Sequence, residues 1–433
     1  MLVEFSVENY RSFKEKVTFS MLASDDTSHE DANVITLPDG KRLLKSAAIY
    51  GANASGKSNL IKAMDFMSSF VYTSHQKRPD DRIQVEPFKL DATCLDKPSK
   101  FDIIFYCNNV KYAYGFSATT RDVIEEYLYS FQDGNDDEQI IFSRNSAIDP
   151  EYEFAQGEDT VLLKHLCQFN GNNKLYLSTA FIFNYPKVVD AYKWICDLNS
   201  YNFNSPYNIL HTGYFDKDAD EEKLQGARVH VNKAIQWVKE IDVAISDVQI
   251  NENPDLFKDD FTFNNDNWER YLKIQNNIET THEVHNPDGT RTQFVLNFYN
   301  NESAGTKWFF SIALYFAERM SRAGIFIADE LNISLHTLLA KHIVSLFHST
   351  ISNPLCSQLI FTTHDTNLLD LDLLRRDQIW FLEKNPDVGG TSMFSLCEFD
   401  VDENSEKAFA NIEKGYLLGI YGAIPFVGGA ING

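Results

Sequence analysis

The first 130 residues carry short runs in which apolar and polar positions alternate, a pattern typical of half-buried β-strands. Residues 2–10 alternate in this way, and residues 17–21 repeat the pattern after a short turn, so we expect these two strands to pair. Three more runs, at 101–106, 112–116 and 124–129, follow without helical patterns between them. They predict an antiparallel meander.

A second pattern consists of consecutive apolar residues, at 46–50, 325–328 and 359–361. Continuous apolar runs of this length are typical of strands that are buried on both faces. Residues 59–71 have apolar side chains at helical spacing directly after the first of these runs. Together the patterns predict an α/β fold with a mixed central sheet and a separate antiparallel β layer.

The pattern of apolar and polar residues differs in the middle of the chain. Residues 227–243 have a helical pattern, whereas residues 251–266 are polar, acidic and rich in Asn and Phe. Residues 290–299 alternate again after a turn-like segment at 286–289, which predicts a hairpin strand. We therefore expect three parts: an N-terminal lobe at 1–183, a mainly helical insertion at 184–281 and a C-terminal lobe at 282–433.

Composition narrows the functional classes. The 433 residues include 39 Lys and Arg against 62 Asp and Glu, a formal net charge of -23, which argues against a broad nucleic-acid-binding surface but allows a local basic groove. The six cysteines form no C-x-x-C pair, which favours reduced thiols over disulfides or zinc. With no leader pattern and no apolar run of membrane-spanning length, we expect a soluble, cytoplasmic protein without a membrane partner.

The most specific motif follows the apolar run at 46–50. Residues 51–58 read Gly-Ala-Asn-Ala-Ser-Gly-Lys-Ser, which fits the phosphate-binding P-loop at every fixed position. In such a loop Lys57 reaches the β- and γ-phosphates and Ser58 ligates Mg²⁺, while backbone N–H groups and the helix N-terminus hold phosphate oxygens. The predicted ATP contacts are Gly51, Asn53, Ala54, Ser55, Gly56, Lys57, Ser58 and Asn59.

Two carboxylates complete a candidate nucleotide site. Asp329 and Glu330 follow the apolar run at 325–328, where the carboxyl end of a strand presents ligand-binding groups. We expect Asp329 to support Mg²⁺ and Glu330 to act as the general base that polarises the attacking water. The alternative is an exposed strand end that happens to be acidic.

Four weaker signals accompany this pair. Ser303 and Gly305 precede an apolar helix, where they either meet a phosphate or simply cap the helix. His364 follows the apolar run at 359–361 and two threonines. It either hydrogen-bonds a γ-phosphate or steers the attacking water, or it is a structural histidine. Residues 332–336 either face a partner subunit or form an ordinary turn. His282 and His285 suggest a metal pair only weakly, because they sit on an alternating strand.

The order and spacing of these motifs resemble the ABC-type ATPase heads of the SMC, RecF and OLD group. The segment Phe-Ser-Val-Glu-Asn-Tyr-Arg-Ser-Phe at residues 5–13 also resembles that group's first strand and turn, which implies that Arg11 and Ser12 contact the nucleotide. The chain is most similar to the short stand-alone ATPases of bacterial anti-phage and restriction-linked loci, of the Rlo and PARIS type. The resemblance covers residues 2–364.

The resemblance implies a P-loop NTPase of ABC type that uses ATP and Mg²⁺. It also implies a head-to-tail dimer in which Ser303 and Gly305 of one copy close over ATP held by the other. Lys57, Glu330 and His364 would then be the catalytic residues, and Ser58 and Asp329 the metal ligands. The sequence departs from the family in its signature, which reads Ser-Ala-Gly-Thr, and the Mg²⁺-ligating Gln is not identified, although Gln84 is available.

The leading functional hypothesis is an ATP-hydrolysing dimeric switch that senses, holds or releases an effector protein encoded nearby, in anti-phage defence. One alternative is a RecF-like clamp that binds DNA when ATP is bound, and another is a scaffold in which ATP is purely structural. The insertion lacks the sustained heptads of an SMC coiled coil. The residues after His364 are too few for the nuclease domain of OLD proteins, so intrinsic nuclease activity is disfavoured.

Overall fold

The computed structural model describes residues 1–131, 138–155, 160–198, 200–201, 221–241, 244–250, 278–332, 336–399 and 412–423. Its contacts divide the chain into two compact units. The first unit contains Met1–Tyr201, Gly324–Asn332 and Ala340–Gly433, and the second contains Asn202–Ala323 and Ile333–Leu339. The predicted insertion at 184–281 is therefore divided between the units, and its acidic stretch at 251–266 lies outside the described residues.

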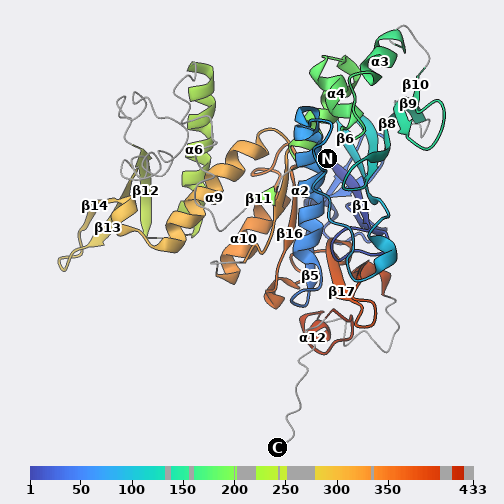
Figure 1. Ribbon diagram of the computed structural model, residues 1–433. Helices are drawn as coiled ribbons and strands as arrows, with labels where there is room; N and C mark the ends of the chain where they lie inside the picture. Colours follow the sequence, from blue (N-terminus) through green and yellow to red (C-terminus); the bar gives the residue numbers. More distant parts are fainter. Residues whose placement is uncertain are drawn as a thin grey trace, which may run out of the picture. The chain divides into compact units, whose positions relative to one another are not determined.

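A seven-stranded sheet forms one layer of the first unit, in the order β10-β9-β8-β7-β6-β1-β2 with antiparallel neighbours throughout (Figure 1). Its strands are β1 (Leu2–Glu8), β2 (Val17–Ser20), β6 (Ser99–Cys107), β7 (Val110–Ala118), β8 (Val123–Phe131), β9 (Glu138–Asn145) and β10 (Tyr152–Phe154). Phe5 of β1 lies opposite Phe19 of β2, as the alternating pattern requires. The predicted strand pair and antiparallel layer are both confirmed.

The central sheet of this unit has the order β11-β15-β16-β5-β17-β18. Its strands are β5 (Ser46–Gly51), β11 (Ser200–Tyr201), β15 (Ile325–Ala328), β16 (Gln358–Thr362), β17 (Ile379–Lys384) and β18 (Thr391–Ser395). All neighbours are parallel except β17 and β18, so the sheet is mixed as expected. Because parallel strands end at one edge, the segments after β5, β15 and β16 meet there.

Helix α2 (Lys57–Thr73) packs between the two sheets (Figure 1). Its buried face includes Leu60, Met64 and Met67, which share one hydrophobic core with Phe5 of β1 and Ile49 of β5. Since both faces of the helix contact apolar sheet surface, its first turn is held rigidly at the end of β5. The first unit also contains all or most of α1 (Glu30–Asn33), β3 (Val34–Thr36), β4 (Arg42–Leu44), α3 (Thr160–Cys167), α4 (Tyr176–Ile182), α5 (Val189–Cys196), α10 (Thr337–His348) and α12 (Ile412–Leu417).

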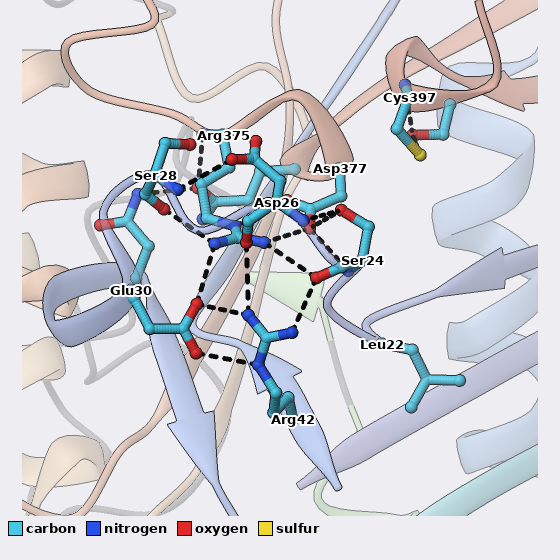
Figure 2. Close-up of polar contacts among 12 residues, drawn as sticks. Leu22, Ser24, Asp26, Ser28, Glu30, Arg42, Arg375, Asp377 and Cys397 are labelled. Atoms are coloured by element: carbon cyan, nitrogen blue, oxygen red, sulfur yellow. Dashed lines mark hydrogen bonds and ion pairs between the residues drawn. The ribbon is translucent and has the colours of Figure 1, made fainter.

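A charged network holds the segment that leads into β17 (Figure 2). The fully buried Arg375 guanidinium donates to both carboxylate oxygens of Asp377, at 2.9 and 2.7 Å. Asp377 in turn accepts from the backbone N–H and hydroxyl of Ser24, both at 2.8 Å, and Arg42 pairs with Glu30 beside it. Pairing of this kind offsets the free-energy cost of removing the charges from water. The network therefore ties the N-terminal region to the strand next to β5.

Glu126 is a second buried charge, on β8. It is fully buried and accepts hydrogen bonds from the N–H groups of Tyr176 and Leu177, at 2.5 and 3.0 Å, and from the hydroxyl of Tyr114 at 3.1 Å. Burial raises the pKa of this carboxyl to about 7, although these donors oppose the shift. The carboxylate thus caps the first turn of α4.

We expect Glu126→Ala to destabilise the protein by about 2–4 kcal/mol, because two N–H groups at the start of α4 lose their acceptor in a buried place. Thermal unfolding followed by circular dichroism measures the loss. Glu126→Gln keeps one acceptor oxygen and should lower the melting temperature less. Equal melting temperatures for the alanine and glutamine variants would contradict the capping role.

The second unit contains α6 (Glu221–Ile241), β12 (Ile245–Ile250), β13 (Ile278–His285), β14 (Arg291–Asn297), α8 (Phe298–Asn301) and α9 (Ala304–Met320). Helices α6 and α9 pack together, and β12-β13-β14 form an antiparallel sheet. The predicted hairpin is confirmed, but its strand was expected to reach residue 299. It ends at Asn297 because the side chain of Asn297 accepts from the N–H of Asn300 at 3.0 Å and starts α8. Strand β12 was not predicted.

Candidate functional site

The loop between β5 and α2 has a backbone shape that requires glycine at two positions. Gly51 and Gly56 have positive φ, at 156° and 117°. A Cβ atom would lie 2.4 Å from the carbonyl oxygen of Leu382 at Gly51, and 2.6 Å from Oγ1 of Thr391 at Gly56. Both distances are too short for any side chain. The loop is therefore as tightly curled as phosphate binding requires.

The start of α2 offers unused hydrogen-bond donors. No side chain caps the helix at Gly56, so its first N–H groups are available to an anion, with the positive end of the helix dipole behind them. The buried hydroxyl of Ser55 has no hydrogen-bond partner among the described residues. These are the groups that a phosphate would satisfy.

Lys57 supplies the positive charge at this loop. Its side chain is buried, and its ammonium donates to the carbonyl oxygens of Gly51 and Ala52, at 2.7 and 3.1 Å. Burial lowers the pKa of Lys57 to about 8, against the opposing effect of Glu330 and Asp329. A cation held by neutral carbonyls would be better compensated by a phosphate.

One pocket of about 490 Å³ gathers most of the predicted site residues. It is lined by Ser12, Asn53, Ala54, Ser55, Gly56, Lys57, Ser58, Asn59, Glu330, His364 and Lys384. Ser12 is placed by Asn59, whose amide donates to the Ser12 hydroxyl at 2.9 Å. The fold thus brings the P-loop, Glu330 and the strand-end histidine together, although long stretches of sequence separate them. Gly51 and Asp329 are not among the lining residues.

The acidic pair is positioned by Thr362, the last residue of β16. The fully buried Thr362 hydroxyl donates to the Asp329 carboxylate at 2.7 Å and accepts from the N–H of Glu330 at 2.7 Å. Glu330 has a φ of 57°, a conformation that costs a non-glycine residue energy. The Thr362 hydroxyl therefore holds Glu330 in a strained turn. Sequence reasoning missed this residue, and its only signal was a hydroxyl at the end of an apolar strand.

His364 lies beside Glu330 in the pocket. Its Nε2 is 3.9 Å from Oε1 of Glu330, and both side chains are partly exposed. Burial, reinforced by the charge of Lys57, lowers the pKa of His364, so the ring is neutral at pH 7. A neutral imidazole can accept as well as donate a hydrogen bond.

The β17–β18 hairpin supports the P-loop from the opposite side, which sequence reasoning also missed. The Thr391 hydroxyl donates to the backbone oxygen of Ser55 at 2.7 Å, and its N–H donates to the backbone oxygen of Ser12 at 2.8 Å. Lys384, the last residue of β17, lines the pocket. No motif marks either residue, because only the pairing of β17 with β5 brings the hairpin to the loop.

Two further candidate ligands, Arg11 and Gln84, also lie outside the lining of the pocket. The guanidinium of Arg11 forms an ion pair with Glu86 and donates to the hydroxyl of Tyr10 at 3.1 Å. Arg11 is not among the residues that line the pocket, and neither is Gln84, which is exposed. In this structure Arg11 therefore contacts Glu86 and not the P-loop.

Ser303 and Gly305 belong to the second unit. The Ser303 hydroxyl accepts from the N–H of Thr306 at 3.0 Å, so Ser303 is the N-cap of α9, as one of the two interpretations required. A Cβ atom on Gly305 would meet only Ser303 Oγ, at the ordinary distance of 3.7 Å. Packing among the described residues therefore gives no reason for glycine at 305.

Other candidate groups have structural partners or lie partly outside the described residues. Nε2 of His282 is 2.7 Å from Oε1 of Glu302, while His285 is exposed. Within the described part of the chain, no group of three or more Cys, His, Asp or Glu residues could hold a metal, the six cysteines form no disulfide, and no helix could cross a membrane. Of the loop at 332–336, residues 333–335 lie outside the described residues.

Comparisons with known proteins place these features in a family. No curated protein sequence matches the chain. Among solved structures, the SMC head domain from Thermotoga maritima is 11% identical, with a TM-score of 0.40, and the match covers 92% of this chain and 99% of that one. An SmcHead bound to the C-winged helix domain of ScpA is 13% identical, with a TM-score of 0.39 and coverage of 94% and 99%.

A protein-family model gives the decisive comparison. The model described as "AAA domain, putative AbiEii toxin, Type IV TA system" matches residues 46–370, a range that includes the P-loop, the acidic pair and His364. This range is more than half of the 433 residues. The chain therefore belongs to the AAA_21 family of P-loop ATPase domains.

Proposed function

We propose that the protein binds ATP with Mg²⁺, hydrolyses it, and uses the cycle as a dimeric switch that holds or releases an effector protein in anti-phage defence. The observation that carries the proposal is that Glu330 and His364 line the same pocket as Lys57 and Ser58. A site that only stored ATP would need the P-loop but not a carboxylate facing it. The family description, which names a toxin system, supports the defence context.

The residues present fit a nucleotide and its metal. The curled loop, the buried Lys57 ammonium and the Ser55 hydroxyl without a partner provide a cradle for phosphates. Ser58 and Asp329 would hold Mg²⁺, which neutralises charge on the phosphates when bound. Glu330 would take the proton of the attacking water, and neutral His364 would orient that water or the terminal phosphate.

Hydrolysis is expected to depend on Thr362. Thr362→Val removes the hydroxyl that joins Asp329 to the Glu330 N–H, so we expect about a tenfold loss of turnover with ATP affinity nearly unchanged. Phosphate-release assays and calorimetry separate the two quantities. Thr362→Ser keeps the hydroxyl and should restore most of the turnover. If valine and serine variants turned over equally, the bridge would have no role in hydrolysis.

ATP affinity is expected to fall as pH rises above about 8. Lys57 has a pKa of about 8 without ligand, and a bound triphosphate raises it by favouring the ammonium. Above that pH, binding must first protonate the amine, so affinity drops by up to about tenfold per pH unit. Titration calorimetry at pH 7, 8 and 9 measures this. Adenosine has no phosphate to contact Lys57, and its binding should not follow the same profile.

The dimer is tested by Ser303, using a Glu330→Gln background that keeps ATP bound. Adding Ser303→Asp preserves the N-cap of α9, because aspartate caps as well as serine, but places a negative charge where a phosphate would lie. Sedimentation velocity should show an ATP-dependent dimer for Glu330→Gln and for the Ser303→Thr control, but not with Ser303→Asp. A dimer of unchanged stability with aspartate would exclude capping of ATP by Ser303 of a second copy.

Binding experiments with the wild-type protein distinguish the effector switch from the DNA clamp and from the purely structural ATP site. Co-purification with the product of a neighbouring gene, dependent on ATP and lost with ADP, would support the effector switch. A RecF-like clamp instead predicts ATP-dependent DNA binding that weakens steeply with salt, against which the net charge of -23 argues. A purely structural ATP site predicts binding without phosphate release.

A further inference from the structure

The edge of the second unit's sheet at β14 is the longest open sheet edge in the described part of the chain (Figure 1). β14 spans seven residues, Arg291–Asn297, and β13 is its only neighbour among the described strands. The other sheet edges are β2, β10, β11, β12 and β18, with four, three, two, six and five residues, and the three-residue β3 and β4. An edge strand presents unpaired N–H and C=O groups, which makes it a template for pairing with another chain.

β14 lacks the features that usually block such pairing. Its sequence, Arg-Thr-Gln-Phe-Val-Leu-Asn, contains no proline and no lysine. The β13–β14 ladder has no bulge, whereas the ladder at the opposite edge of the same sheet, between β12 and β13, shifts register between Ile245 and Asp247. The apolar side chains of Phe294 and Val295 are 58% and 55% exposed. A long, regular and partly apolar edge of this kind favours association.

The hairpin turn fixes which backbone groups of β14 point away from β13. The Asn286 N–H donates to the Thr290 carbonyl oxygen at 2.9 Å. In an antiparallel ladder the hydrogen-bonded pairs recur at every second residue, so Phe294 bonds to the residue opposite it on β13. The N–H and C=O groups of Gln293 and Val295 therefore point away from β13, toward the position of an added strand.

The charges of β14 favour a second copy in antiparallel register. The chain carries a net charge of -23, so two copies repel each other wherever acidic residues meet. β14 has no acidic residue, and its one charged residue, Arg291, lies at one end and pairs with Glu283 at 3.0 Å. In an antiparallel self-pair centred on Phe294, Arg291 lies opposite Asn297 of the second copy. A parallel pair in register would instead place two arginines side by side, which destabilises a sheet.

The same register satisfies the outward backbone groups and brings apolar side chains together. Gln293 lies opposite Val295 of the second copy, and because both have outward-pointing backbone groups, the two residues exchange a pair of hydrogen bonds. The two Phe294 rings meet on one face at the centre of the pair, and cross-strand aromatic pairs stabilise a sheet. Both copies use the same surface, as in most two-fold dimers.

We propose that β14 pairs with β14 of a second copy, antiparallel and centred on Phe294, so that the two three-stranded sheets become one continuous sheet. This contact needs no nucleotide and goes beyond the proposed function, in which ATP closes a different contact at Ser303. One pair of seven-residue edges buries little area, so the contact by itself is weak. A chain that has both contacts can form assemblies larger than a dimer.

Disulfide trapping tests the register. Phe294→Cys places two thiols at the centre of the pair, where the Cα atoms of a non-hydrogen-bonded pair lie about 4.5 Å apart, within the range of a disulfide. Mild oxidation of the nucleotide-free protein should therefore link two copies, and peptide mapping should find position 294 joined to position 294. Thr292→Cys is the matched control on the same face, because its two Cα atoms would lie about 13 Å apart, too far for a disulfide. Equal linkage of the two variants, or no linkage of either, would overturn the proposed register.

Sedimentation velocity without nucleotide measures the strength of the contact. Wild type should form a dimer whose fraction rises with protein concentration. Phe294→Lys should weaken this dimer about tenfold or more, because two ammonium groups meet at the centre of the pair. Phe294→Tyr keeps an aromatic ring and should keep the dimer. Because Phe294 is largely exposed, wild type and both variants should have the same melting temperature.

The outcomes separate this inference from the proposed function. Ser303→Asp removes only the ATP-dependent contact, so this variant should still form the nucleotide-free dimer. A wild type that stays monomeric without nucleotide overturns the inference, and so does a nucleotide-free dimer that Phe294→Lys leaves unchanged. Failure of the protein to bind or hydrolyse ATP would overturn the proposed function alone, since the β14 contact does not depend on nucleotide.

Discussion

Glu330→Gln is expected to lower ATP hydrolysis about 100-fold or more while ATP still binds, because the amide cannot accept the proton of the attacking water. Glutamine has nearly the same shape as glutamate, so the turn at residue 330 and its N–H bond to Thr362 should persist. Phosphate release under single-turnover conditions measures the chemical step, and calorimetry measures ATP affinity. Because nucleotide is no longer consumed, the variant should also accumulate the ATP-bound dimer.

Glu383→Gln is the matched control for this experiment. Glu383 is an exposed carboxylate near the C-terminal end of β17, in the central sheet, and it does not line the P-loop pocket. Its replacement should leave hydrolysis unchanged. Normal turnover by Glu330→Gln would show that another group, with His364 the nearest candidate, removes the proton. Loss of ATP binding by that variant would instead mean that Glu330 helps to bind ATP before the chemical step.

Lys57→Met is expected to weaken ATP binding about 100-fold or more, because it removes the ammonium that donates to the P-loop carbonyls. The same substitution should leave the folded protein as stable as wild type or more stable. A buried ammonium without an anion costs free energy, as the lowered pKa of Lys57 shows, and methionine fills similar space without charge. In this variant the ATP affinity, measured by calorimetry, should therefore fall while the melting temperature, measured by thermal unfolding, does not.

Lys62→Met provides the comparison on the same helix. Lys62 is exposed on α2, away from the lining of the pocket, so its loss should change neither ATP affinity nor stability measurably. Tight ATP binding by Lys57→Met would contradict the assignment of the pocket as the phosphate site. A large drop in its melting temperature would mean that the ammonium is a structural support of the loop.

Local patterns in the sequence were sufficient for most of the secondary structure of the first unit. The alternation at residues 2–10 and 101–129 required one buried face, and only a sheet provides that arrangement. The P-loop motif was equally local, since its two glycines are needed for the backbone between β5 and α2. The strand predicted at 290–299 begins one residue later, at Arg291, and ends two residues earlier, at Asn297. It ends there because the Asn297 side chain competes with strand pairing by capping α8.

Prediction was weakest where a residue acts through a partner distant in sequence. The nucleotide contact of Arg11 stays a prediction, and the sequence did not indicate the ion pair that its guanidinium forms with Glu86. Thr362 and Thr391 carry no motif, and each became visible only through hydrogen bonds to residues that other strands bring near. A hydroxyl in an apolar strand has many possible partners, and the sequence does not say which strand will be its neighbour.

By itself, the sequence determined the chemistry available to this protein: a phosphate-binding loop, a lysine, two carboxylates and a histidine at the ends of apolar strands. These signals are short-range, because backbone conformation and strand burial depend on neighbouring residues. Only the tertiary structure decided that β16 lies between β5 and β15 and that the β17–β18 hairpin closes the other side. That order depends on long-range pairing, and it brings Glu330, His364 and Lys384 to one pocket with Lys57.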